Sequence, residues 1–277
     1  MNTIGIKIAA VAVLALAPSV ASAGKGGSAT AIRAAIASSS PTAIIAELER
    51  AESLICEECV QLVTNLTEDS RYEVREVAGW WFARRPALKD MLVQQFTVDL
   101  ATGSTVKVRN AADFLGSTKT YAALPQLRTA IHRGDLGTEA KLALVRAAGA
   151  IAHVRGNEVL TTAMADSEPS VRAAAVVAWR DVLDQKTAEP VVGLLGDADA
   201  NVRAQAATVV GGLLEQSARP ALEAIVLHDA DSFARRNAAW ALGRLGSAAS
   251  RGALIQATTD SSTLVRGAAK AALSSLH

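Results

Sequence analysis

Apolar and small side chains recur at helical spacing along most of the chain. Counted from a recurring basic residue such as Arg203, the positions −1, +3, +6, +7 and +10 are mostly apolar. In a helix these positions share one face, so each such segment is predicted to be an amphipathic helix that buries one stripe. Alanine is abundant and favours helix over strand. The pattern therefore predicts a stack of short helices.

The recurring basic residue belongs to an internal repeat. It returns at intervals of 31 to 34 residues, and valine precedes it in five of the seven copies. The seven positions are Arg75, Arg109, Lys141, Arg172, Arg203, Arg235 and Arg266. Six residues earlier lies an aspartate in six of the copies, and Gly103 takes its place in the second copy. Two markers that keep their register over seven copies indicate a structural repeat.

Each repeat is predicted to contain two helices. The first often has an early proline, where the missing N–H has no helical partner to lose. These prolines are Pro86, Pro125, Pro190 and Pro220. Good capping residues precede several of the second helices. They are Thr105, Asp199, Asp231 and Ser262.

The repeat resembles a known family. Its pattern Asp-x-x-x-x-Val-Arg-x-x-Ala-x-x-x-Leu-Gly is similar to HEAT repeats, especially the short bacterial kind also found in phycobilin lyases. The segments 229–243 and 260–273 match this pattern best, and the resemblance covers residues 52–277. It implies an all-α fold, namely a right-handed α-solenoid of about seven helix pairs with an N-terminal capping helix.

The resemblance also implies roles for the repeated residues. The second helices are expected to line the concave face. The aspartates and arginines are expected to form a buried or half-buried polar ladder, which is architectural because it recurs in every copy. Its members are Asp69, Arg75, Asp166, Arg172, Asp197, Arg203, Asp229, Arg235, Asp260 and Arg266. Arrays of this family serve mostly as scaffolds and adaptors.

Two segments at the N-terminus do not belong to the repeat. Residues 1–23 have Lys7, a short apolar run and the ending Ala21-Ser22-Ala23. This is the pattern of a secretory signal peptide, too short to span a membrane. Residues 24–51 are expected to hold a flexible start and capping helices, and residues 41–66 fit either one long helix or two helices with a break near Glu52.

Composition and charge narrow the partners. Removal of Lys7 with the leader leaves 27 basic and 27 acidic side chains. Nucleic-acid binding normally needs a basic surface, so no nucleic-acid partner is expected. The leader indicates export to the periplasm or the cell exterior, its alanine-rich composition is typical of bacteria, and no membrane anchor is expected after cleavage.

Cys56 and Cys59 are the two cysteines of the chain. In an exported protein two cysteines usually pair, so a structural disulfide is favoured, while free or intermolecular thiols and a redox or metal role stay open. Val60 excludes covalent haem attachment, and the two glutamates between the cysteines disfavour a thiolate. No other cysteine pair or histidine cluster offers a metal site, and no cofactor is expected.

Catalytic signatures are missing from the sequence. It contains no phosphate loop, dinucleotide fingerprint, G-x-S-x-G elbow or HExxH motif. The chain is therefore predicted not to be an enzyme, and a chromophore-lyase activity would rest on the family resemblance alone.

Large side chains that do not repeat are the candidates for partner binding. Trp80, Phe114, Arg146 and Trp240 lie at position +5, outside the core stripe, whereas Trp179 lies at the core position +7. Arg180 and Arg236 lie near these residues in the repeat register. Exposed tryptophan and arginine dominate binding hot spots. Alternatively, these rings fill gaps between repeats.

The interpretation that follows is an exported scaffold or adaptor that binds a protein or peptide on the concave face. The alternative is a periplasmic accessory protein for redox or cofactor handling, in which Cys56 and Cys59 act.

Overall fold

The computed structural model describes residues 27–276, and this part of the chain contains sixteen α-helices and no strand. The helices are α1 (Ala29–Ala37), α2 (Pro41–Arg50), α3 (Glu57–Leu66), α4 (Tyr72–Ala83), α5 (Pro86–Thr102), α6 (Thr105–Ser117), α7 (Leu124–Ile131), α8 (Thr138–Ile151), α9 (Asn157–Ala163), α10 (Pro169–Asp181), α11 (Glu189–Val192), α12 (Ala200–Gly212), α13 (Arg219–His228), α14 (Ser232–Leu245), α15 (Arg251–Ala257) and α16 (Thr263–Ser274). Within residues 27–276, no helix is long and apolar enough to cross a membrane. The predicted signal peptide lies outside the described residues.

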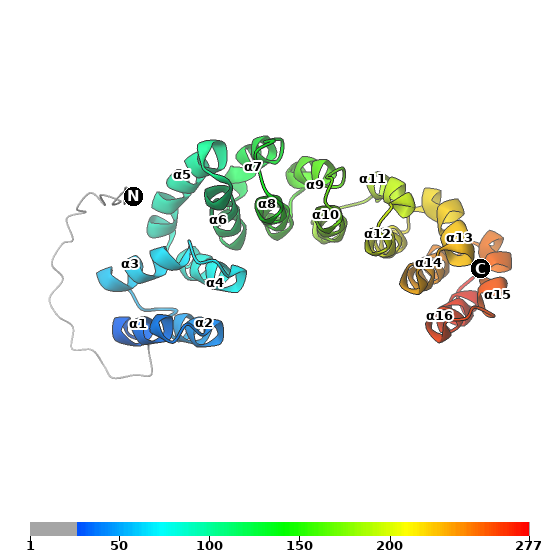
Figure 1. The fold of residues 1–277 in the computed structure, drawn as a ribbon, viewed down its shortest axis with the longest axis horizontal. Helices are drawn as coiled ribbons and strands as arrows, with labels where there is room; N and C mark the ends of the chain where they lie inside the picture. The colour runs from blue at the N-terminus through cyan, green and yellow to red at the C-terminus, as the bar shows by residue number, and fades with distance from the viewer. Residues whose placement is uncertain (1–26, 277) are drawn as a thin grey trace.

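The helices form a two-layered arch (Figure 1). From α5 onward the odd-numbered helices lie on its outer side and the even-numbered helices on its inner, concave side. The repeated basic residue lies on the even-numbered helices from α4 to α16. These helices therefore line the concave side. The predicted all-α solenoid is confirmed. Its seven predicted helix pairs are α3 to α16, but the N-terminal cap is itself a helix pair, α1 and α2, instead of one helix.

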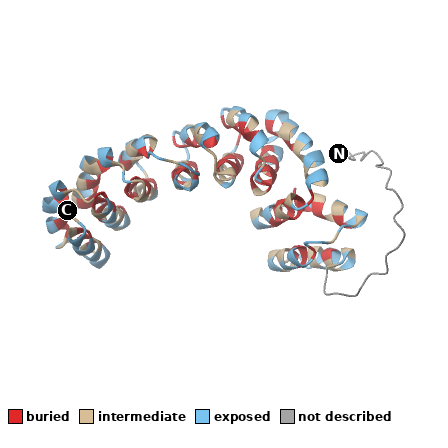
Figure 2. Ribbon diagram, turned by 180° about the vertical axis from the view of Figure 1, so that it is seen from behind, coloured by how far each residue is buried: buried red, intermediate tan, exposed pale blue. Residues whose placement is uncertain are grey.

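The core runs along the contact between the two layers (Figure 2). Small residues set the spacing between neighbouring inner helices. A Cβ atom added at Gly211 would lie 2.7 Å from Ala241, and one at Gly243 would lie 2.7 Å from Ala272. Such distances are far below van der Waals contact, so only glycine permits this approach. The abundance of alanine and glycine in the repeats is therefore a packing requirement.

Residues 41–66 form two helices, which settles the alternative that the sequence left open. α2 ends at Arg50, and Cys56 is the N-cap of α3. Side chains of the following repeat donate hydrogen bonds to the turn between α2 and α3. Arg85 donates to the carbonyl oxygens of Glu52 and Leu54, both at 2.7 Å, and Trp81 Nε1 donates to Ala51 at 3.0 Å.

The polar ladder runs from each repeat to the next one. Nε and Nη2 of Arg203 donate to both carboxylate oxygens of Asp229, at 2.6 and 2.7 Å. Its Nη1 donates to the carbonyl oxygens of Asp197 and Ala198 in its own turn. Arg172 binds Asp197 and Arg235 binds Asp260 in the same way. Lys141 reaches Asp166 at 2.6 Å.

The ladder departs from this register at its N-terminal end. By register Arg75 would bind an aspartate at position 103, which is glycine. Instead Arg75 binds Asp113 of α6 through Nε and Nη2, at 2.9 and 2.6 Å. Asp69 is bound by Arg71 at 2.8 Å, and it contacts Arg75 only through its main-chain carbonyl oxygen, so the side chains of these two ladder residues do not pair.

Candidate binding surface on the concave face

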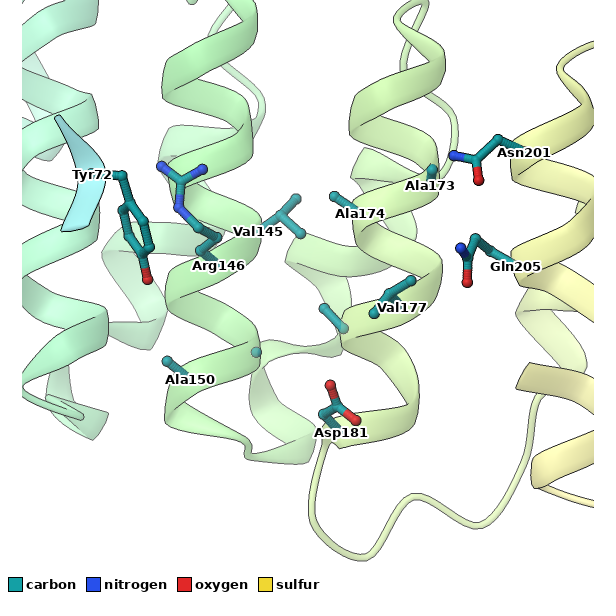
Figure 3. A pocket seen from close by; sticks show the side chains of 12 residues that line it. Tyr72, Val145, Arg146, Ala150, Ala173, Ala174, Val177, Asp181, Asn201 and Gln205 are labelled. Atoms are coloured by element: carbon teal, nitrogen blue, oxygen red, sulfur yellow. The ribbon is translucent and has the colours of Figure 1, made fainter. Parts of the chain in front are cut away.

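A hollow of about 540 Å³ lies on the concave face between α8, α10 and α12. Its floor consists of small apolar residues, and polar side chains stand at both ends (Figure 3). Arg146 and Tyr72 lie at one end, Asn201 and Gln205 lie at the other, and Asp181 lies between them at the C-terminus of α10. The floor residues are Val145, Gly149, Ala150, Ala173, Ala174, Val177 and Ala178. An extended chain could contact this floor closely because few side chains rise from it.

The N-terminal end of the hollow is closed by a charged cluster. Arg146 donates to both carboxylate oxygens of Asp113, at 2.9 and 3.2 Å from Nη2, and Arg75 binds the same carboxylate from the other side. The Asp113 side chain is fully buried. The Arg146 guanidinium also lies 4.4 Å from the centre of the Tyr72 ring. Burial raises the pKa of Tyr72, and the nearby Glu76 raises it further.

This cluster links three inner helices. Arg75 is on α4, Asp113 on α6 and Arg146 on α8. One carboxylate of α6 thus serves an arginine from each neighbouring inner helix. Residues 110–116 of α6 are all buried.

A second exposed feature lies on α14, nearer the C-terminus. Phe233 and Trp240 are 58% and 42% exposed, which is high for aromatic side chains in a helix that packs on both neighbours. They are seven residues apart and therefore share one face of α14. Phe233 occupies the same position in its repeat as Asn201, and Trp240 occupies the same position as Val177. Because Asn201 and Val177 line the hollow, both rings belong to the concave face. Arg236 and Arg244 are exposed on the same helix.

The six residues predicted from the sequence do not form one site. Trp240, Arg236 and Arg180 are exposed, and Arg180 bonds Asp181 at 3.2 Å. Trp80 is half-buried beneath Arg84, whose guanidinium lies 3.7 Å from the ring centre. Arg146 belongs to the charged cluster described above.

Phe114 is a wrong prediction for the binding surface. It is 1% exposed and packs against Phe96 and Phe82, with ring centroids 4.6 and 5.9 Å apart. The reason is that its ring packs between Phe82 of α4 and Phe96 of the outer helix α5, and position +5 is buried in this repeat alone. Trp179, expected in the core, is 3% exposed and donates to the carbonyl of Thr187 at 2.8 Å.

Sequence reasoning missed Phe233 and Tyr72. Phe233 could have been found, because it lies one heptad before Trp240 and thus on the same face. Tyr72 could not, because its position beside Arg146 depends on the pairing of Arg75 with Asp113.

Cys56 and Cys59 are joined by a disulfide in the structure. Helix α3 begins between them, so the bridge joins an extended N-cap residue to the first turn. Cys59 is fully buried in the core. Within residues 27–276, no group of three or more His, Cys, Asp or Glu side chains is arranged to hold a metal ion.

Comparison with known proteins finds HEAT repeats over residues 188–274. The Escherichia coli protein YibA has a similar structure, with 15% identity, 84% of this chain and 87% of that chain covered, and a TM-score of 0.55. A mutant of Kap121p shares 14% identity, with 86% of this chain and 32% of that chain covered, and a TM-score of 0.52. Curated protein sequences give no match. At these identities the likeness shows the fold alone.

A further similar structure is the CpcE–CpcF complex of phycocyanin lyase from Nostoc, with 18% identity, 79% and 94% coverage and a TM-score of 0.41. The prediction that this chain is not an enzyme stays a prediction. Residues 188–274 are HEAT repeats, and the described chain has the fold of a HEAT-like α-solenoid.

Proposed function

We propose that this chain is an exported scaffold or adaptor that binds a segment of a protein partner on its concave face. The observation that carries the proposal is the exposed pair Phe233 and Trp240 on the inner helix α14, with Arg236 between them. Aromatic and arginine side chains contribute most of the binding energy in protein interfaces. A solvent-exposed pair on a concave helix is therefore best explained by a partner that covers it.

The shape of the surface supports an extended partner. Stacked repeats create a long concave surface, which solenoid proteins use for binding. The small-residue floor around Ala174 continues toward α14 through Gly212, whose surroundings are open. Neighbouring helices are about 10 Å apart, so a chain that runs from Arg146 on α8 to Trp240 on α14 would need roughly ten extended residues.

The disulfide gives less support to the alternative redox role. Cys59 has no exposed surface, and Glu57 and Glu58 stand beside the bridge. Negative charge at that place disfavours the thiolate that disulfide exchange requires, whereas the position of Cys56 at the N-terminus of α3 favours it. A structural bridge that fixes the start of α3 accounts for the same features.

The test begins with affinity capture from the native envelope fraction and identification of the partner by mass spectrometry. Binding of the purified partner is then measured for Trp240→Ala and for Trp179→Ala. We expect Trp240→Ala to weaken binding by about 2 kcal/mol or more, roughly thirtyfold, with a nearly unchanged melting temperature. Trp179→Ala should lower stability instead. Unchanged affinity of Trp240→Ala would reject this surface as the binding site.

A further inference from the structure

The three C-terminal inner helices have basic side chains and no acidic ones within their helical segments. The inner helices α12, α14 and α16 contain no aspartate or glutamate. Their basic residues are Arg203, Arg235, Arg236, Arg244, Arg266 and Lys270. By contrast, each of the inner helices α4, α6, α8 and α10 has at least one acidic residue.

Most of this positive charge is not neutralised within the described residues. Arg203 and Arg235 bind the aspartates of the following repeats. Arg236, Arg244, Arg266 and Lys270 form no ion pair with any residue from 27 to 276. The exposed aromatic pair therefore shares α14 with two arginines, Arg236 and Arg244, that pair with no carboxylate in residues 27–276.

Arg266 is the best-defined of these cations. Its Nη1 donates to the carbonyl oxygens of Asp260 and Ser261, at 2.7 and 2.9 Å. The same two contacts hold the guanidinium of Arg203 and of Arg235 in its turn. In those repeats Nε and Nη2 then bind an aspartate, whereas in Arg266 neither atom has an acceptor within the described chain. The guanidinium group of Arg266 is thus held in the same orientation as in the arginines that bind an aspartate.

Most of the other irregular places in the ladder have a substitute partner. Where an aspartate is missing at Gly103, Asp113 binds Arg75. Asp69 is bound by Arg71, and Arg109, which reaches no carboxylate, donates through Nε and Nη2 to Asn110. In Arg266 these two atoms have no acceptor in residues 27–276, and Lys270, one helical turn away, adds positive charge there.

We propose that the bound partner segment is acidic where it reaches the last repeat and that one of its carboxylates binds Nε and Nη2 of Arg266, beside the turn that precedes α16. This inference rests on the proposed function, because it specifies the chemistry of the partner. The repeats show the ligand that fits. Where Arg172, Arg203 and Arg235 bind an aspartate, that carboxylate also accepts from the amide two residues later, as Asp229 does from Asp231 at 2.8 Å. An Asp-x-Asp or Asp-x-Ser turn matches this arrangement.

A polypeptide fits this surface better than a nucleic acid. Single-strand binding proteins stack successive bases on aromatic side chains along a basic groove. Here the exposed aromatic side chains of the inner helices α12, α14 and α16 all lie on α14, and the net charge of the whole chain is +1. A bidentate guanidinium fork suits a planar carboxylate.

The experiment uses the full chain and a labelled, end-capped peptide Asp-Ala-Asp-Ser-Phe-Ala, which copies residues 229–234. Fluorescence anisotropy at low salt measures its binding up to millimolar protein. We expect Arg266→Gln to weaken binding about tenfold or more, since hydrogen bonds to charged groups are the stronger ones. Arg266→Lys, which keeps the charge but not the fork, should weaken it comparably. A peptide in which Asn replaces the first Asp should bind the native chain with an affinity reduced by the same factor. Its affinity should not change further in Arg266→Gln.

Arg251→Gln is the matched control, because it removes an exposed arginine from the outer helix α15. It should bind as the native chain does. No detectable peptide binding, equal loss in Arg251→Gln and Arg266→Gln, or tighter binding of a single-stranded oligothymidylate that displaces the peptide would each overturn the proposal. Melting temperatures of all variants exclude misfolding.

The two proposals fail separately. If Arg266→Gln loses the peptide while Trp240→Ala retains affinity for the natural partner, the acidic-ligand site stands and the aromatic surface is rejected. If Trp240→Ala loses the natural partner but Arg266→Gln binds peptide and partner normally, the proposed function stands and the role of Arg266 is rejected.

Discussion

Asp113→Asn tests the link between the irregular ladder and the shape of the concave face. Asp113 accepts hydrogen bonds from Arg75 and Arg146 at 2.6 to 3.2 Å, and its side chain is completely buried. The Arg75 side chain is only 2% exposed. The substitution keeps the size of the side chain but removes the only carboxylate between two guanidinium groups.

The expected cost follows from that burial. An uncompensated buried charge destabilises a protein by about 3–5 kcal/mol. In a chain of this size each kcal/mol lowers the melting temperature by about 2–4 °C, so a decrease of roughly 6–20 °C is expected. Arg146→Gln should cost less, because it leaves the buried pair of Arg75 and Asp113 intact.

Thermal and urea unfolding followed by far-UV circular dichroism provide the assay. The matched control is Asp135→Asn, since Asp135 also binds an arginine, Arg133 at 2.7 Å, but is 64% exposed. Exposed pairs contribute less than about 1 kcal/mol. A destabilisation by Asp113→Asn no larger than that by Asp135→Asn would refute the argument that this cluster joins α4, α6 and α8.

Three further predictions concern stability. Replacing Cys56 by Ser and Cys59 by Ala should cost about 2 kcal/mol, the value for closing so short a loop; an unchanged urea midpoint would contradict it. Hydrogen bonds from Arg172, Arg203 and Arg235 lower the pKa values of Asp197, Asp229 and Asp260. The stabilisation from these three ion pairs is therefore fully present above the ordinary aspartate pKa of about 4, and it is lost as the pH falls below that value. The melting temperature of the native chain should decrease in this pH range. It should decrease less in Asp229→Asn, which lacks one of the three titrating carboxylates. Trp179→Ala should cost about 3–5 kcal/mol in chemical unfolding because it leaves a cavity in the core; a cost near that of a surface substitution would contradict its buried position.

The sequence predicted the repeated parts of this molecule well. The register of Arg203 and its aspartates indicated helix pairs and a ladder, because each repeat places the same residues in the same environment. It did not give the direction of the ladder, since Arg203 could bind Asp197 or Asp229 with the same spacing.

The irregular parts could not be predicted from local pattern. Phe114 occupies the register position of Trp240, yet it is buried because its ring packs against Phe82 and Phe96. These aromatic residues do not recur in the other repeats, so the repeat pattern could not indicate the contact. The concave surface therefore had to be located from the three-dimensional contacts.

Site-specific photocrosslinking tests the central claim, that the partner binds the concave face. A photoreactive residue at Thr208, on the inner helix α12, is compared with one at Gln256, on the outer helix α15. The account predicts that the captured partner is crosslinked from position 208, that Trp240→Ala reduces this crosslink, and that position 256 gives none. A partner crosslinked from position 256 as efficiently as from position 208 would contradict it.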